Sequence, residues 1–111
     1  MLPELRIESE FVASLKRRDA HAFEELVRES CGILLVVAKR FFPNEADAHD
    51  AVQEAFLNAY RAIELFDGGS KVSTWLHRIL INVCLSKIRS RSRRPEKNIE
   101  AMLPQFLRDG H

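Results

Sequence analysis

This 111-residue sequence contains little that would interrupt a helix: it has only four glycines and four prolines. So few helix-breaking residues favour a few long helices over many short strands joined by tight turns. No apolar run approaches the roughly 20 residues that span a bilayer, and the N-terminus lacks the basic-then-apolar pattern of a secretory signal. We therefore expect an intracellular protein, located in the cytoplasm, that does not insert into a membrane.

Cysteine is also scarce, with Cys31 and Cys84 as the two examples. They form no CxxC pair and have no histidine beside them in a ligand pattern, which argues against a zinc site and against a disulfide framework. Each falls on or near an apolar face, so we interpret both as small buried hydrophobic residues. The four histidines do not cluster either. We expect neither a metal nor a cofactor.

The charged residues are unevenly distributed along the chain, although the formal net charge is only +1. Residues 1–67 carry 8 Lys/Arg and 13 Asp/Glu, whereas residues 68–111 carry 9 and 3. This asymmetry suggests one surface for a basic partner and another for a polyanion. Two solvated faces that attract each other would produce the same counts.

Hydrophobic periodicity predicts four helices, over residues 7–17, 19–42, 44–63 and 73–91. We therefore predict an all-α protein, a compact bundle of about four helices. The predicted inward-facing residues include Leu15, Leu26, Val27, Leu34, Ala38, Ala48, Val52, Ala55, Ala59, Trp75, Leu80 and Ile88. Several of these are alanines, which permits close packing of the third helix.

Capping residues support the helix boundaries. Asp19 and Asn44 are suitable N-caps for the second and third helices, and Asp47 stands where a capping-box acid would be. Ser73 or Thr74 can cap the fourth helix. Pro95 ends the predicted domain, and residues 96–111 form a tail that could contain one more short helix.

The predicted outward face of the third helix is acidic. Asp47, Asp50 and Glu54 recur at helical spacing, accompanied by Gln53 and Leu57. A solvated acidic face would look the same, but an amide and an exposed apolar anchor among the carboxylates suit docking to a basic helix. No nucleophile, phosphate-binding loop or metal cluster accompanies the carboxylates, so we expect a protein that is not an enzyme.

The fourth helix and the loop before it have the opposite chemistry. Arg78, Asn82, Ser86 and Arg89 follow one stripe of the helix. Cationic groups bind phosphates and polar side chains can read base edges, although arginines at a helix C-terminus also simply compensate the helix dipole. The loop over residues 67–73 contains two adjacent glycines and several donors, and could hold an extruded base.

Three stretches, in their order and spacing, resemble region 2 of extracytoplasmic-function sigma factors. They are FEELV at 23–27, DAHDAVQEAFL at 47–57, and TWLHRILIN at 74–82, which follows the loop at 66–73. The resemblance extends over residues 8–95, and the second and third stretches are each distinctive. It implies that residues 1–95 form a sigma region 2 domain, with residues 96–111 beginning an interdomain linker and the second DNA-binding domain, region 4, absent.

The resemblance also implies functional residues. One family segment docks on the clamp helices of the polymerase β′ subunit. The residues that match it are Asp47, Asp50, Gln53, Glu54 and Leu57. The loop over residues 67–73 matches the segment that captures a flipped base of the non-template strand of the −10 element. Asn82 matches a position that lines the pocket for this base. Arg78 and Ser86 lie on the helix that matches the −10-reading helix of the family. With Arg89 of the basic stripe, the predicted DNA-binding residues are Asp67, Gly68, Gly69, Ser70, Lys71, Ser73, Arg78, Asn82, Ser86 and Arg89.

The sequence departs from the family pattern at three places. Arg18 stands where glycine is common, Ser86 stands where Asn or Asp is frequent, and residues 68–72 are specific to this chain. The −10 sequence preference therefore cannot be carried over. The implied partners are core RNA polymerase, promoter DNA and an anti-sigma factor. Two other interpretations stay open: a stand-alone regulator that binds duplex DNA, and a helical protein-interaction module.

Overall fold

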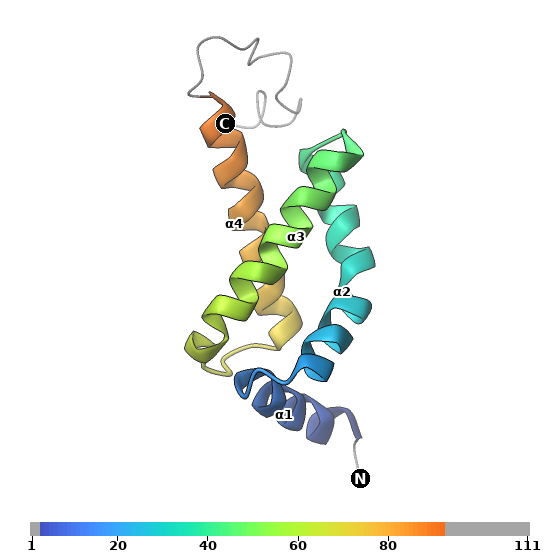
Figure 1. Ribbon diagram of the computed structural model, residues 1–111, viewed down its shortest axis with the longest axis vertical. Coiled ribbons are helices and arrows are strands. Elements are labelled where there is room, and N and C mark those ends of the chain that lie inside the picture. Colours follow the sequence, from blue (N-terminus) through green and yellow to red (C-terminus); the bar gives the residue numbers. More distant parts are fainter. Residues whose placement is uncertain (1–2, 93–111) are drawn as a thin grey trace.

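The computed structural model describes residues 3–92 and contains four α-helices within that range (Figure 1). They are α1 (Pro3–Lys16), α2 (Ala20–Phe41), α3 (Glu45–Ala62) and α4 (Val72–Ser92), with a short 3-10 helix, η1 (Ile63–Leu65), after α3. The predicted all-α bundle is confirmed. The predicted tail over residues 96–111 lies outside the described residues.

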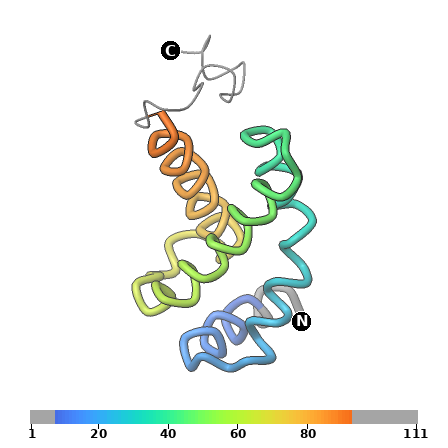
Figure 2. The backbone as a smooth tube through the Cα atoms, turned by 45° about the horizontal axis from the view of Figure 1, so that its top comes forward, coloured from blue at the N-terminus to red at the C-terminus, as the bar shows by residue number. Residues whose placement is uncertain are grey.

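Helix α3 makes the most extensive contacts in the bundle: it packs against both α2 and α4, which also contact each other. Helix α1 packs against α2 and η1, and lies across one end of the bundle (Figure 1). A second view shows α1 and the first turns of α2 together at this end, with the last turns of α4 at the opposite end (Figure 2). The loop between η1 and α4 therefore lies at the α1 end.

The core is built around small residues of α3. Ala48, Ala51, Ala55 and Ala59 all have no exposed surface, and alanine at these four positions brings the neighbouring helices close to the α3 backbone. Larger side chains from the other helices complete the core, with Leu15, Leu34, Ile63, Leu76, Leu80 and Cys84 fully buried. The prediction that Val27 faces inward is wrong, because this side chain is 38% exposed and lines a surface groove together with Tyr60 of α3.

Two of the predicted helix caps are present. The Asp19 carboxylate accepts the His21 N–H at 2.9 Å, and the Asn44 side-chain oxygen accepts the N–H groups of Ala46 and Asp47 at 2.8 and 3.3 Å. Both side chains satisfy backbone donors that have no partner inside their own helix. The predicted starts of the second and third helices are therefore accurate to one residue.

The predicted cap of the fourth helix is wrong. Helix α4 begins at Val72, so Ser73 and Thr74 lie within its first turn. The reason is a long-range contact: the N–H of Val72 donates to the Glu8 carboxylate of α1 at 3.0 Å. A first helical N–H can be satisfied by any acceptor that the fold brings close, and the local sequence does not reveal one supplied by another helix.

Arg18 connects α1 to α2 in a left-handed conformation, with φ of +60°. This conformation costs a non-glycine residue about 1 kcal/mol or more. The Arg18 side chain makes contacts that glycine could not make. It donates to the carbonyl of Tyr60, lies over the Tyr60 ring at 4.9 Å, and pairs with Glu64 at 3.5 Å. Arginine at this position thus ties the helix junction to the end of α3.

Candidate functional site

The loop between η1 and α4 has a shape that its own residues determine. The Asp67 carboxylate accepts the N–H of Gly69 at 2.9 Å, forming a turn closed by the Asp side chain. Gly68 has a φ of +83°, which other residues adopt only with strain. A Cβ at position 69 would lie 3.1 Å from the Asp67 carboxylate oxygen. Both glycines therefore suit a tight turn that exposes its backbone.

One side of this loop forms a hollow with the first turns of α4. The residues lining it are Leu65, Phe66, Asp67, Gly69, Ser70, Trp75 and Arg78. Arg78 donates to the Ser70 hydroxyl at 3.3 Å, and that hydroxyl donates to the carbonyl of Lys71 at 3.1 Å. Four of the predicted DNA-binding residues, Asp67, Gly69, Ser70 and Arg78, thus meet at a single hollow.

Trp75 has two environments. Its ring packs against Phe66, with the ring centroids 5.1 Å apart, and it contacts the core as predicted. The ring is only partly buried, however, and it also lines the hollow beside the loop. An aromatic surface beside hydrogen-bonding side chains is a suitable environment for an unstacked base.

The other side of the loop faces a groove with different chemistry. Here Gly68, Lys71 and Ser73, also predicted to bind DNA, line a space between α1 and α2. Three carboxylates share that space, from Glu8, Glu25 and Glu29. The loop therefore separates a hollow containing Arg78 from an acidic groove.

The remaining predicted DNA-binding residues lie further along α4. Asn82 and Ser86 are exposed and line a shallow groove between α4 and α3, facing Glu54 and Asn58. Arg89 is exposed one turn beyond. Asn82 is not among the residues that line the loop hollow, and it lies one helical turn from Arg78. The four predicted residues of α4, at positions 78, 82, 86 and 89, are all exposed and follow one another at helical spacing.

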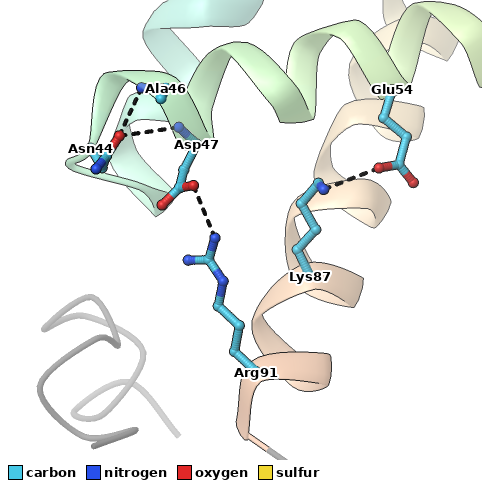
Figure 3. Close-up of polar contacts among 6 residues, drawn as sticks. All are labelled: Asn44, Ala46, Asp47, Glu54, Lys87 and Arg91. Carbon is cyan, nitrogen blue, oxygen red and sulfur yellow. Dashed lines mark hydrogen bonds and ion pairs between the residues drawn. The ribbon is translucent and has the colours of Figure 1, made fainter. Parts of the chain in front are cut away.

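The acidic stripe of α3 is divided into two parts, contrary to the prediction of one outward face. Asp47 and Glu54 turn toward α4, where Asp47 lies 3.1 Å from Arg91 and Glu54 lies 3.1 Å from Lys87 (Figure 3). The Arg91 guanidinium also lies 5.1 Å from the centre of the Phe42 ring. The two ion pairs occur because the last turns of α4 run beside α3.

The outward part of α3 consists of Asp50, Gln53 and Leu57. All three are exposed, and Leu57 retains 50% of its surface although it is a large apolar side chain. Tyr60, one turn beyond Leu57, is 43% exposed. A row with one carboxylate, one amide and apolar side chains has the composition of a docking face.

Cys84 is buried, as predicted, whereas the predicted burial of Cys31 is wrong, because this residue is only partly buried. Burial raises the pKa of the Cys84 thiol to about 11, although the nearby Lys87 acts in the opposite direction. Cys31 is partly buried and lines a shallow surface groove with Phe23, Val27 and Tyr60. Across residues 3–92 no group of His, Cys, Asp and Glu side chains is placed to hold a metal ion. Within the same range, no helix is both long and apolar enough to cross a membrane.

Comparison with known proteins identifies the family. Residues 26–94 match Sigma-70 region 2. The chain belongs to the sigma-70 region 2 family. The predicted relationship to extracytoplasmic-function (ECF) sigma factors is confirmed, and so is the expectation that the chain is not an enzyme, because sigma factors are transcription initiation factors.

Individual relatives agree with this assignment. RNA polymerase sigma-H factor of Pseudomonas aeruginosa is 35% identical over 94% of this chain and 54% of its own length. ECF RNA polymerase sigma factor SigM of Mycobacterium tuberculosis is 34% identical over 89% of this chain and 50% of its own. ECF RNA polymerase sigma-E factor of Escherichia coli is 34% identical, with 89% and 52% covered. The chain therefore spans about half the length of the curated relatives it matches.

A solved structure extends the comparison to the fold. It is the NMR structure of an engineered region 2 of sigmaE in complex with GTAAAA, and it superposes on this chain with a TM-score of 0.72. The two share 36% sequence identity, over 81% of this chain and 94% of the other. The four-helix arrangement is thus that of a sigma region 2.

Proposed function

We propose that this sigma region 2 binds core RNA polymerase and captures the non-template strand of a promoter −10 element, acting in the bacterial cytoplasm. One observation carries the proposal: Asp67, Ser70, Trp75 and Arg78 converge on one hollow beside a self-capped glycine loop. The complex of the related sigmaE region with GTAAAA supports it, since that protein has the same fold.

The hollow would hold a base without catalysing a reaction. Unstacking a base costs a few kcal/mol, and the site must offset this with edge hydrogen bonds and ring contacts. Asp67 and Ser70 supply acceptors and a hydroxyl, Arg78 supplies donors, and the partly exposed ring of Trp75 supplies an apolar surface. The strand then continues along α4, where Asn82, Ser86 and Arg89 are exposed. Because arginine–phosphate contacts release counterions, binding weakens steeply with salt.

Polymerase docking is assigned to the outward part of α3. Leu57 serves as the apolar anchor, and Asp50 and Gln53 surround it with hydrogen-bonding groups for a basic helix of the β′ clamp. Asp47 and Glu54, predicted for the same role, are already paired with Arg91 and Lys87. Because these cations neutralise most of their charge, Asp47 and Glu54 contribute less to docking than Asp50 does.

Two further expectations belong to this proposal. An anti-sigma factor that covers the outward part of α3 or the loop hollow would silence the domain by competition. The domain boundary is proposed at residue 95, with residues 96–111 as the start of an interdomain linker. The end of the family match at residue 94 supports this boundary.

The proposal predicts that the two binding activities can be separated by mutation. Asp50→Arg should reduce retention of bacterial core polymerase about tenfold or more, because it places a cation against a basic partner. It should leave binding of single-stranded GTAAAA intact. Asn82→Ala should weaken binding of single-stranded GTAAAA and leave retention of core polymerase intact. Glu24→Arg, on α2, is the control for the change in charge, and circular dichroism verifies folding.

Equal loss of both activities in both folded variants would contradict the proposal. Tight binding of duplex DNA by the wild type, without retention of polymerase, would favour the stand-alone regulator. Retention of polymerase with no affinity for single strands would leave only the docking half of the proposal.

A further inference from the structure

The first turn of α4 begins directly after the DNA-binding loop, so whatever fixes this turn also fixes the loop. The first N–H groups of a helix have no partners within the helix. The carbonyl of Lys71, the residue before the helix, accepts the N–H groups of Thr74 and Trp75, both at 3.1 Å. The N–H of Val72 donates to the Glu8 carboxylate at 3.0 Å. The cap of α4 therefore comes from α1, 64 residues earlier in the chain.

The hydrogen bond between Val72 and Glu8 lies in a partly buried position at the start of α4. Val72 is only 3% exposed and Glu8 is partly buried, so water does not readily replace the carboxylate. A carboxylate at a helix N-terminus also interacts favourably with the helix dipole. Together the backbone donor and the dipole hold α1 against the start of α4, and Ser70 and Lys71 immediately precede that point.

Glu8 is unsuited to touch DNA directly. Its carboxylate lies in the acidic groove with Glu25 and Glu29, on the side of the loop away from Arg78. The three carboxylates outnumber Lys71, which also lines this groove, so a nucleic-acid strand would follow the Arg78 side. Any effect of Glu8 on DNA binding must therefore act through the loop and the first turn of α4.

We propose that Glu8 is a positioning residue for DNA binding, which fixes the base-capturing loop by capping α4 from α1. The inference rests on the proposed function and adds a residue outside the loop and α4. In its absence, the Val72 N–H is left without an acceptor in a partly buried site, the first turn of α4 frays, and the loop is anchored at one end only.

Variants at position 8 distinguish the effect of the hydrogen-bond acceptor of Glu8 from the effect of its negative charge. Glu8→Ala removes the acceptor, whereas Glu8→Gln keeps a side-chain oxygen and removes the charge. Glu29→Ala is the matched control, because it removes a carboxylate from the same groove while the Val72 N–H keeps its acceptor, Glu8. We expect Glu8→Ala to weaken binding of single-stranded GTAAAA about tenfold, the loss of one charge-assisted hydrogen bond. Glu8→Gln should recover most of that affinity, and Glu29→Ala should not weaken binding.

Two further measurements distinguish positioning from general destabilisation. Retention of core polymerase should be unchanged in all three variants, and hydrogen exchange of the Val72 amide should accelerate in Glu8→Ala alone. In a Val72→Pro background the donor is absent, and proline is tolerated at a first helical position. There, Glu8→Ala should cause no additional loss of DNA affinity. This background also provides the test if Glu8→Ala alone does not fold.

Three outcomes would overturn the inference. Glu8→Ala could bind single-stranded GTAAAA as Glu29→Ala does, or lose polymerase and DNA affinity in equal proportion. It could also weaken DNA binding equally with and without the Val72 N–H. Accelerated exchange at Val72 with unchanged DNA affinity would refute positioning and leave the proposed function standing. Failure of the wild type itself to bind any single strand would refute the DNA half of the proposed function, and the inference with it.

Discussion

The alanines of α3 make the packing of the bundle testable at one position. Ala55 has no exposed surface and lies on the buried face of α3, whose neighbours are α2 and α4. Ala55→Leu adds three carbon atoms where no free surface exists, so the neighbouring helices must move or the side chain must leave its preferred rotamer. Overpacking of this kind costs about 1–3 kcal/mol.

The expected change in melting temperature follows from the size of the domain. For a domain of about 90 residues, each kcal/mol lowers the melting temperature by about 4–8 °C, so Ala55→Leu should lower it by about 4–24 °C. The control is Ala46→Leu, at an exposed position in the first turn of the same helix. It should change stability by less than about 0.5 kcal/mol. The assay is thermal unfolding followed by circular dichroism at 222 nm.

Equal melting temperatures for the two leucine variants would show that α3 is not tightly enclosed, and would refute this account of the core. Separation of α3 from α4 would also disturb the groove that contains Asn82. We therefore expect Ala55→Leu to weaken binding of single-stranded DNA at temperatures where it remains folded.

Three further predictions concern the helix junction and the thiols. Arg18→Ala loses the contacts to Tyr60 but keeps the left-handed backbone, whereas Arg18→Gly loses the same contacts and relieves the strain. The Arg18→Gly variant should therefore be about 1 kcal/mol more stable than the Arg18→Ala variant in urea unfolding. Equal stabilities would show that the left-handed backbone at residue 18 is not strained. For the cysteines, alkylation of the native protein at pH 8 should modify Cys31 and spare Cys84, whose pKa is raised to about 11. Because the folded state retains the Cys84 proton to higher pH than the unfolded state, the Cys84 contribution should make stability fall between pH 9 and 11. A Cys84→Ala variant that retains the same pH dependence would contradict that assignment.

Local sequence signals predicted most of the fold. The helical spacing of apolar residues identified all four helices, because each buries one face against its neighbours. Asp19 and Asn44 were recognisable as caps because a cap and the helix it begins are adjacent in sequence. The start of α4 was not predictable in this way, since its cap is Glu8 of another helix.

In the candidate site, too, local features were predicted and contacts between helices were not. The loop residues Asp67, Gly68 and Gly69 were identified from turn chemistry, and the structure shows the turn that they form. The division of the acidic stripe was not predicted, because spacing along α3 does not indicate which side of it α4 covers. The charges of Lys87 and Arg91 were visible in the sequence, but their pairing depends on the register between two helices.

The central claim, that α3 and α4 present separate faces to polymerase and to DNA, can be tested by site-specific photo-crosslinking. A photoreactive amino acid would replace Leu57 in one variant and Arg78 in another, in the presence of core polymerase and a single-stranded −10 oligonucleotide. Both side chains are exposed, so neither replacement disturbs the core. The account predicts crosslinks from position 57 to the β′ subunit and from position 78 to the oligonucleotide. Crosslinks from both positions to the same partner, or from position 57 to DNA, would contradict it.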